Sequence, residues 1–165
     1  MAVRRPPPHV GGYFSPMIVL RSNSVAETEA FGEELGRSAS LGWIYGLSGD
    51  LGAGKTALVR GFARGLGCPD RVHSPTFALL NEYEGGRLRL FHLDLYRLNS
   101  AEEVRAAGLE EYLTHPDGVA VVEWIERWCG DAQATEGSGP GTLRRIHLST
   151  LSENVRQIGH DNAGA

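Results

Sequence analysis

"GDLGAGKT", residues 49–56, matches the phosphate-binding pattern G-x-x-x-x-G-K-[ST]. The apolar run before it, "WIYGLS" (43–48), predicts a buried strand. After it, apolar residues recur at helical spacing as far as Leu66, and Gly67 with Pro69 is a typical helix stop. A strand before the motif and a helix after it are the context that a phosphate-binding loop, or P-loop, requires.

The composition of this loop suits the geometry of a phosphate cradle. Backbone N–H groups must point inward, which needs positive φ angles that glycine tolerates. A lysine ammonium is compact enough to reach between the β- and γ-phosphates of a nucleotide, and a threonine hydroxyl can bind Mg²⁺. The sequence therefore predicts a nucleotide and Mg²⁺ site formed by the whole loop: Gly49, Asp50, Leu51, Gly52, Ala53, Gly54, Lys55 and Thr56.

Lys55 is the only lysine in the chain, and every other fixed basic side chain is arginine. A guanidinium is too broad and forked to take the place of the lysine in a phosphate cradle. The single lysine thus stands where phosphate chemistry requires one, which argues against a glycine-rich turn that arose by chance. The ordinary guanine signature, Asn-Lys-x-Asp, needs another lysine and is excluded.

Two carboxylates directly follow apolar runs that predict strands. Asp94 ends "LRLFHLD" and Glu123 ends "VAVVE". A P-loop enzyme needs such a group at a strand end, to hold Mg²⁺ or to position an attacking water. The alternative for each is a strand-end cap or a salt bridge. We expect both to belong to the nucleotide site.

Four further residues near these carboxylates have two interpretations each. Trp124 either covers the nucleotide or belongs to the core. Thr76, in "SPTF", either acts as a switch threonine that senses the γ-phosphate or forms a plain turn. His92 and Arg97 flank Asp94, and for both we favour a structural role, although Arg97 can also reach phosphate.

The remaining pattern predicts the α/β class, as a mixed, mostly parallel sheet flanked by helices. The run "GVAVVEW" (118–124) is the clearest buried strand, because its apolar residues are consecutive. A hairpin is expected from "LRRIHLST" (143–150) and "NVRQIGH" (154–160). Capping-box spacing at Ser24 and Ser100 predicts two helix starts, with the first helix ending near Gly42.

The chain of 165 residues is long enough for one domain with a substantial core. We expect a disordered leader at 1–15, a P-loop domain at 16–160 and a flexible tail at 161–165. The stretch "DAQATEGSGPG" (131–141) predicts a polar surface loop.

The bulk composition excludes several classes. A net charge of −4 does not favour a broad nucleic-acid-binding face. No run approaches the roughly 20 apolar residues of a membrane helix. The two cysteines, Cys68 and Cys129, have no metal-ligand spacing and are typical of reduced thiols in a cytoplasmic protein.

Four segments together resemble one family closely: "GDLGAGKT", "SPTFALLNEY", "FHLDLYRL" and "VEW", in this order. With the helix pattern "ETEAFGEELG" before them, the chain resembles TsaE, also called YjeE. This family supplies the ATPase of bacterial tRNA threonylcarbamoyladenosine synthesis. The resemblance covers residues 17–130 well and the C-terminal strands loosely.

The resemblance implies a weak, Mg²⁺-dependent ATPase that works with the TsaD–TsaB pair, which modifies adenosine 37 of tRNA. This chain would touch tRNA only indirectly, through that complex. Thr56 and Glu123 would correspond to the Mg²⁺ ligands. Asp94 would be the essential aspartate, and "SPTF" a switch-like loop. The region around Ser24 and Thr28 would lie near the adenine.

Two alternatives remain open from the residues alone. In the first, nucleotide binding rather than hydrolysis is the signal, and the chain is an interaction module. In the second, the chain is a small-molecule kinase, against which the sequence offers only the lack of an arginine-dense acceptor lid.

Overall fold

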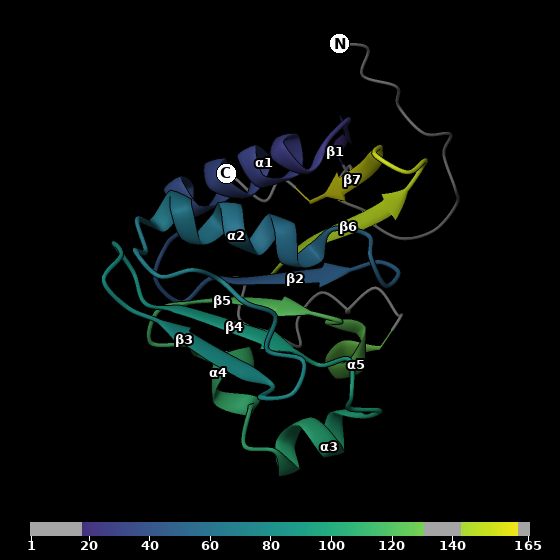
Figure 1. Cartoon of the computed structure of the whole chain (residues 1–165). Coiled ribbons are helices and arrows are strands. Elements are labelled where there is room, and N and C mark those ends of the chain that lie inside the picture. The colour runs from purple at the N-terminus through teal and green to yellow at the C-terminus, as the bar shows by residue number, and fades with distance from the viewer. Residues whose placement is uncertain (1–17, 131–142, 162–165) are drawn as a thin grey trace.

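The computed structural model describes residues 18–130 and 143–161, which form a seven-stranded sheet in the order β1-β7-β6-β2-β5-β4-β3 (Figure 1). The predicted leader, the predicted 131–141 loop and residues 16, 17 and 162–165 lie outside the described part. The strands are β1 (Ile18–Ser22), β2 (Ile44–Ser48), β3 (Leu80–Tyr83), β4 (Leu90–Asp94), β5 (Val119–Glu123), β6 (Leu143–Thr150) and β7 (Arg156–His160).

The sheet is mixed, as predicted, and its centre is parallel. Strands β6, β2, β5 and β4 pair in parallel, whereas β3 pairs antiparallel with β4. The predicted β6–β7 hairpin is confirmed, and β1 adds to it antiparallel to β7. Since β1 therefore runs in the direction of β6, five of the seven described strands point the same way.

Helices cover both faces of the sheet (Figure 1). Two of them, α1 (Val25–Ser38) and α2 (Lys55–Leu66), lie on one face, and three short ones lie toward the other: α3 (Ala101–Ala106), α4 (Glu110–Thr114) and α5 (Glu126–Cys129). All five residues of β5 are buried. Val119 and Val121 belong to the core under α2, and Ala120 and Val122 to the core on the opposite face.

The two predicted helix starts are confirmed. The Ser24 hydroxyl accepts from the Glu27 N–H at 3.1 Å, and the Ser100 hydroxyl accepts from the Glu103 N–H at 3.2 Å. In each case the glutamate also accepts from the backbone N–H of the residue before the cap. Glu27 accepts from Asn23 at 2.8 Å, and Glu103 accepts from Asn99 at 2.9 Å. Helix α1 ends at Ser38, before the predicted Gly42, and the short α5 was not predicted.

Helices α1 and α2 approach each other so closely that only glycine fits between them. An added Cβ at Gly61 would lie 1.9 Å from the Glu29 carbonyl oxygen, and one at Gly36 would lie 2.1 Å from that of Phe62. Arg60 and Arg64 pair with Glu29 and Glu33 beside this contact. Packing against α1 fixes the position of α2, and with it the position of the loop that precedes α2. None of the helices in the described ranges has the length and apolar character needed to cross a membrane.

Candidate nucleotide-binding site

The loop 49–56 joins β2 to α2 with a backbone that glycine adopts most easily. Its φ angles are +133° at Gly49, +78° at Gly52 and +104° at Gly54. Gly49 also has no space for a side chain, because an added Cβ would lie 2.2 Å from the carbonyl oxygen of Leu148. The positive φ angles expected from the sequence are therefore confirmed.

The Lys55 side chain bends back over the loop and is buried, with 4% exposure. Its Nζ donates hydrogen bonds to the carbonyl oxygens of Gly49 at 2.6 Å and Asp50 at 2.8 Å, and it lies 4.1 Å from the centre of the Trp124 ring. Burial lowers the pKa of Lys55, whereas nearby carboxylates, chiefly Glu123, act in the opposite direction. The ammonium is thus held inside the loop as a partly desolvated cation.

Glu123 ends β5 and accepts two hydrogen bonds on one carboxylate oxygen. Thr56 Oγ1 donates to its Oε1 at 2.9 Å, and His92 Nε2 lies 2.8 Å from the same Oε1. His92 is fully buried, and Glu123 is only 3% exposed. His92 thus has the structural role expected for it, and the structure adds that its partner is a predicted Mg²⁺ ligand.

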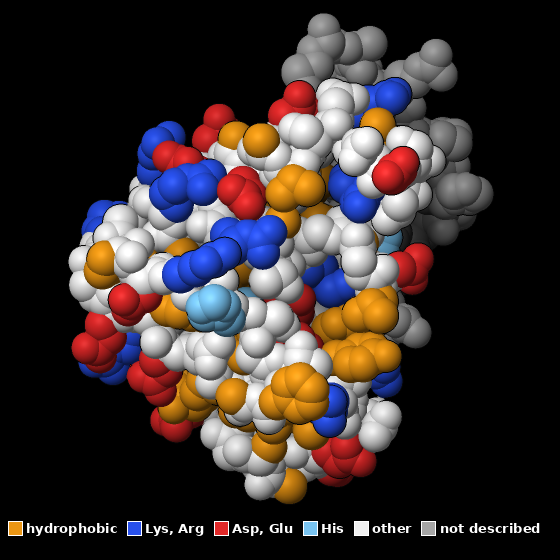
Figure 2. All heavy atoms as spheres, viewed as in Figure 1, with side chains coloured by type: hydrophobic (Ala, Val, Ile, Leu, Met, Phe, Trp, Pro, Cys, Tyr) orange, Lys and Arg blue, Asp and Glu red, His pale blue; other side chains and the backbone are white. Residues whose placement is uncertain are grey.

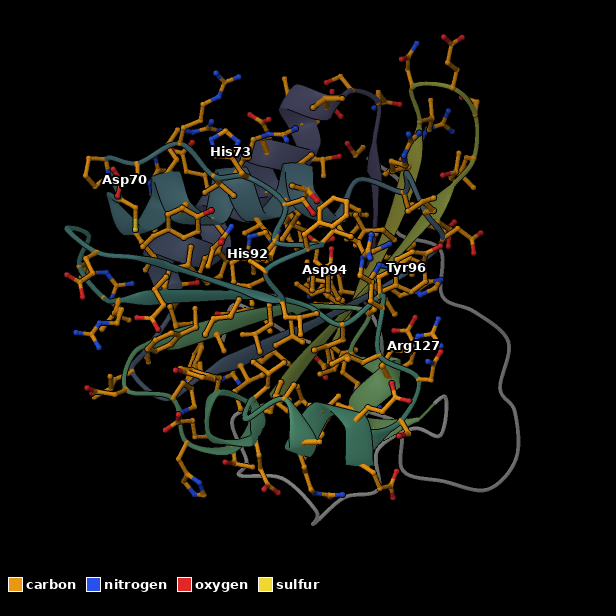
Figure 3. All side chains as sticks on the ribbon, turned by 60° about the horizontal axis from the view of Figure 1, so that its bottom comes forward. Asp70, His73, His92, Asp94, Tyr96 and Arg127 are labelled. Carbon is orange, nitrogen blue, oxygen red and sulfur yellow. The ribbon has the colours of Figure 1, made fainter. Side chains whose placement is uncertain are left out.

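Asp94 ends β4 and is the register partner of Glu123 on the neighbouring parallel strand. Its Oδ2 accepts from Thr76 Oγ1 at 3.0 Å and from Ser74 Oγ at 3.2 Å. Its Oδ1 accepts from the backbone N–H of Tyr96 at 3.0 Å (Figure 3). The strand end and the "SPTF" segment therefore meet at one carboxylate.

Trp124 follows Glu123 with a φ angle of +61°, a left-handed conformation that is uncommon outside glycine. Its ring lies 5.0 Å from the ring of Tyr96 and beneath the Lys55 ammonium. A strained backbone at a strand end is a frequent property of functional sites. Arg97, by contrast, stacks on Phe77 at 4.2 Å, which is the structural role expected for it.

A cavity of about 380 Å³ brings most of the predicted residues together. Its lining includes Lys55, Thr56, Thr76, Asp94, Glu123 and Trp124, together with Leu51, Gly52 and Gly54. Exposed hydrophobic side chains lie on the face that Figure 2 shows, and two that line the cavity, Val25 and Leu51, are 58% and 75% exposed. The buried base of the cavity is therefore charged, and its exposed edge has both apolar and arginine side chains.

The other predicted residues lie around this cavity rather than in its lining. Gly49 and Asp50 line an adjoining hollow, and Ala53 is buried in the core. Thr28 lies against the loop, 3.8 Å from where a Gly54 Cβ would stand, with its hydroxyl 2.8 Å from that of Ser22. Ser24, the cap of α1, is absent from the lining.

The donor set of the cavity suits Mg²⁺. No group of three or more His, Cys, Asp or Glu side chains arranged to hold a metal occurs among residues 18–130 and 143–161. A hydroxyl and a carboxylate already in contact, Thr56 and Glu123, match a hard cation that keeps several waters and takes its other ligands from phosphate. These residues fit such a cation better than a metal enclosed by protein ligands.

The fold and this loop place the chain in the α/β class, with the phosphate-binding sequence pattern at the carboxyl end of a central parallel strand. The family model "Threonylcarbamoyl adenosine biosynthesis protein TsaE" matches residues 22–158. The chain therefore belongs to the TsaE family, as its four sequence motifs indicated.

Individual relatives agree with this assignment. A "tRNA threonylcarbamoyladenosine biosynthesis protein TsaE" from Synechocystis is 48% identical over 103 residues, which are 61% of this chain and 65% of that protein. One of the same name from Bacillus subtilis is 44% identical over 138 residues, 84% of this chain and 81% of that protein. The crystal structure of Bacillus subtilis YdiB superposes with a TM-score of 0.66 at 33% identity, over 87% of this chain and 84% of that one.

Proposed function

We propose that this chain binds and hydrolyses ATP with Mg²⁺ and that it is the ATPase of tRNA N6-threonylcarbamoyladenosine synthesis. The observation that carries the proposal is the convergence of Lys55, Thr56, Asp94 and Glu123 on one cavity beside a loop with the phosphate-binding sequence. The names of the relatives, which refer to this tRNA modification, support the pathway.

Each residue has a role in this proposal. The backbone N–H groups of the loop 49–56 bind phosphate at the N-terminus of α2, where the helix dipole adds positive charge. Lys55 then exchanges its carbonyl partners for phosphate oxygens. Thr56 and Glu123 would hold Mg²⁺, whose chemistry is to neutralise charge on the phosphates.

Asp94 is the proposed group that positions the attacking water. Its contacts with Thr76 and Ser74 would let the "SPTF" segment respond to the γ-phosphate. Trp124 would cover the bound nucleotide, and Ser24 with Thr28 would lie toward the adenine side.

Slow turnover is expected from the isolated chain. Among the residues that the structure describes, two arginines line the cavity, and both are engaged: Arg60 donates to Glu29 at 3.1 Å, and Arg156 donates to the Ala53 carbonyl at 3.1 Å. Neither is therefore positioned to stabilise a transferring phosphoryl group, a role that strongly accelerates such reactions. We propose that TsaD and TsaB, in the cytoplasm, are the partners whose cycle this hydrolysis drives, and that tRNA is reached through them.

The test is reconstitution of the modification with a TsaD–TsaB pair, tRNA, a threonylcarbamoyl donor and ATP, read out as modified nucleoside and as released phosphate. The parent chain should support both. Lys55→Ala should lose ADP binding, hydrolysis and modification, whereas Arg89→Ala, far from the loop and ion-paired to Glu84, should retain them.

Asp94→Asn separates hydrolysis from binding. If this variant binds ADP, hydrolyses no ATP and still supports repeated modification, nucleotide binding is the signal and the ATPase proposal is wrong. Failure of the parent chain to release phosphate even with TsaD–TsaB would also rule it out.

A further inference from the structure

Arg156, the first residue of β7, lies against the loop 49–56 although it is 103 residues away from Ala53 in the sequence. Its Nε donates to the Ala53 carbonyl at 3.1 Å, and its Nη2 donates to the Gly52 carbonyl at 3.3 Å. The third nitrogen, Nη1, donates to three carbonyls of the turn between β6 and β7: Ser152 at 2.9 Å, Glu153 at 3.1 Å and Val155 at 3.2 Å.

One guanidinium thus bridges the β6–β7 turn and the top of the loop. Lys55 holds the carbonyls of Gly49 and Asp50 from the other end of the same loop. The two cations together bind four of the five consecutive carbonyls from residue 49 to residue 53. In the proposed function Lys55 transfers to phosphate, so Arg156 is the cation that stays on the backbone.

The loop needs such an attachment because of its composition. Glycine at positive φ has no steric cost, but it also has many other conformations available. In a trans peptide the C=O and the following N–H point in opposite directions. Holding the Gly52 and Ala53 carbonyls therefore also fixes the directions of two N–H groups. The N–H of Ala53 donates to the Asp50 carbonyl at 3.1 Å, which closes the turn of the loop, and the N–H of Gly54 is one of the groups that can face phosphate.

We propose that Arg156 is a positioning residue that fastens the phosphate loop to the β6–β7 turn and so preorganises it for the nucleotide. The proposal deepens the proposed function and rests on it. Arg156 acts through the loop rather than on the reacting atoms, because its donors already serve five backbone carbonyls. Lysine cannot replace it fully, since one ammonium cannot span both sides of the bridge.

Two measurements on the intact chain test this role. The first is ADP affinity by calorimetry, where Arg156→Ala should weaken binding about tenfold or more, because two charge-assisted hydrogen bonds to the loop are lost. Arg156→Lys should fall between this variant and the parent. The second is hydrogen exchange of the loop amides without nucleotide, where both variants should exchange faster at residues 52–54.

Arg89→Ala is the matched control, since Arg89 is an exposed arginine paired to Glu84 at 3.1 Å. It should change neither measurement. Amide exchange in β5 and the thermal midpoint report global destabilisation. If Arg156→Ala unfolds, Arg156→Lys alone decides the question, by faster exchange confined to the loop together with weaker ADP binding.

Unchanged loop exchange in the folded variants would overturn the proposal, even if ADP affinity fell, because Arg156 would then act on the nucleotide directly. Loss of protection throughout the sheet would overturn it as well, because the role would be general stability. If the parent chain binds no ADP, the proposed function fails, while the exchange measurement still decides whether Arg156 orders the loop.

Discussion

His92, labelled in Figure 3, has its Nε2 2.8 Å from Glu123 Oε1. Its other ring nitrogen is buried and has no hydrogen-bond partner in the part of the chain that the structure describes. A carboxylate only accepts, so Nε2 carries the proton and donates to Glu123. The histidine and Thr56 together occupy one carboxylate oxygen. Glu123 is therefore held in one orientation before any cation arrives.

The first prediction concerns this orientation. His92→Phe removes the donor, and we expect it to raise the Mg²⁺ concentration needed for half-maximal ATP hydrolysis about tenfold, as loss of a residue that orients a metal ligand commonly does. ADP affinity measured with EDTA should stay within about twofold. His115→Gln, at an exposed position after α4, is the control. An unchanged Mg²⁺ dependence in a folded His92→Phe protein would show that Glu123 needs no such support.

The second prediction uses tryptophan fluorescence. Trp124 lies beside Lys55 at the cavity, whereas Trp43 stacks with Arg144 at 3.4 Å and Trp128 with Arg105 at 4.9 Å. Adding ADP to the parent protein should change its emission, and Trp124→Phe should abolish most of that change. A full response in Trp124→Phe would place the reporter at another tryptophan and remove Trp124 from the nucleotide contact.

The third prediction concerns a buried tyrosine away from the site. Tyr45 is fully buried, and its hydroxyl has no hydrogen-bond partner within residues 18–130 and 143–161. Tyr45→Phe removes an unsatisfied polar group, so the free energy of unfolding at neutral pH should rise by about 1 kcal/mol. Urea unfolding of the parent and the variant measures it. A clear loss of stability in the variant would mean that the hydroxyl is satisfied in solution.

The same residue gives stability a pH dependence. Burial raises the pKa of Tyr45 from 10.0 to about 12. Unfolded tyrosine ionises near pH 10. Below pH 10 this residue therefore gives the free energy of unfolding no pH dependence. Between pH 10 and 12 the unfolded chain loses the proton while the folded chain keeps it, so the free energy of unfolding falls as the pH rises. Tyr45→Phe should remove this part of the decline in stability. The two alkaline unfolding curves should differ in slope between pH 10 and 12, and identical slopes would contradict the raised pKa.

Local signals in the sequence predicted much of the fold and part of the site. The loop glycines and the two serine caps depend on neighbouring residues only, and their geometry agrees with prediction. Asp94 and Glu123 were found because each follows a buried strand, although their pairing across strands needed the register. The functions of all these residues stay predictions.

Contacts between distant segments could not be predicted in the same way. His92 lies two residues before Asp94 and so shares its face of β4, which was a usable signal, but its partner comes from another strand. Arg156 binds backbone carbonyls. Because every residue has one, no residue type in the loop indicates that an arginine binds there. Such groups are found only when the strand order is known.

The close contact of α1 with α2 supports the last prediction. In an exposed helix, glycine to alanine stabilises by about 1 kcal/mol. At Gly61 the sign should reverse, because the new methyl group would lie 1.9 Å from the Glu29 carbonyl oxygen and the helices must separate. We expect Gly61→Ala to lower the free energy of unfolding by about 2 kcal/mol. Glu34→Ala, on the exposed side of α1, should change it by less than about 0.5 kcal/mol. Denaturant unfolding compares the two, and a stabilised Gly61→Ala protein would mean that the helices do not pack this closely in solution.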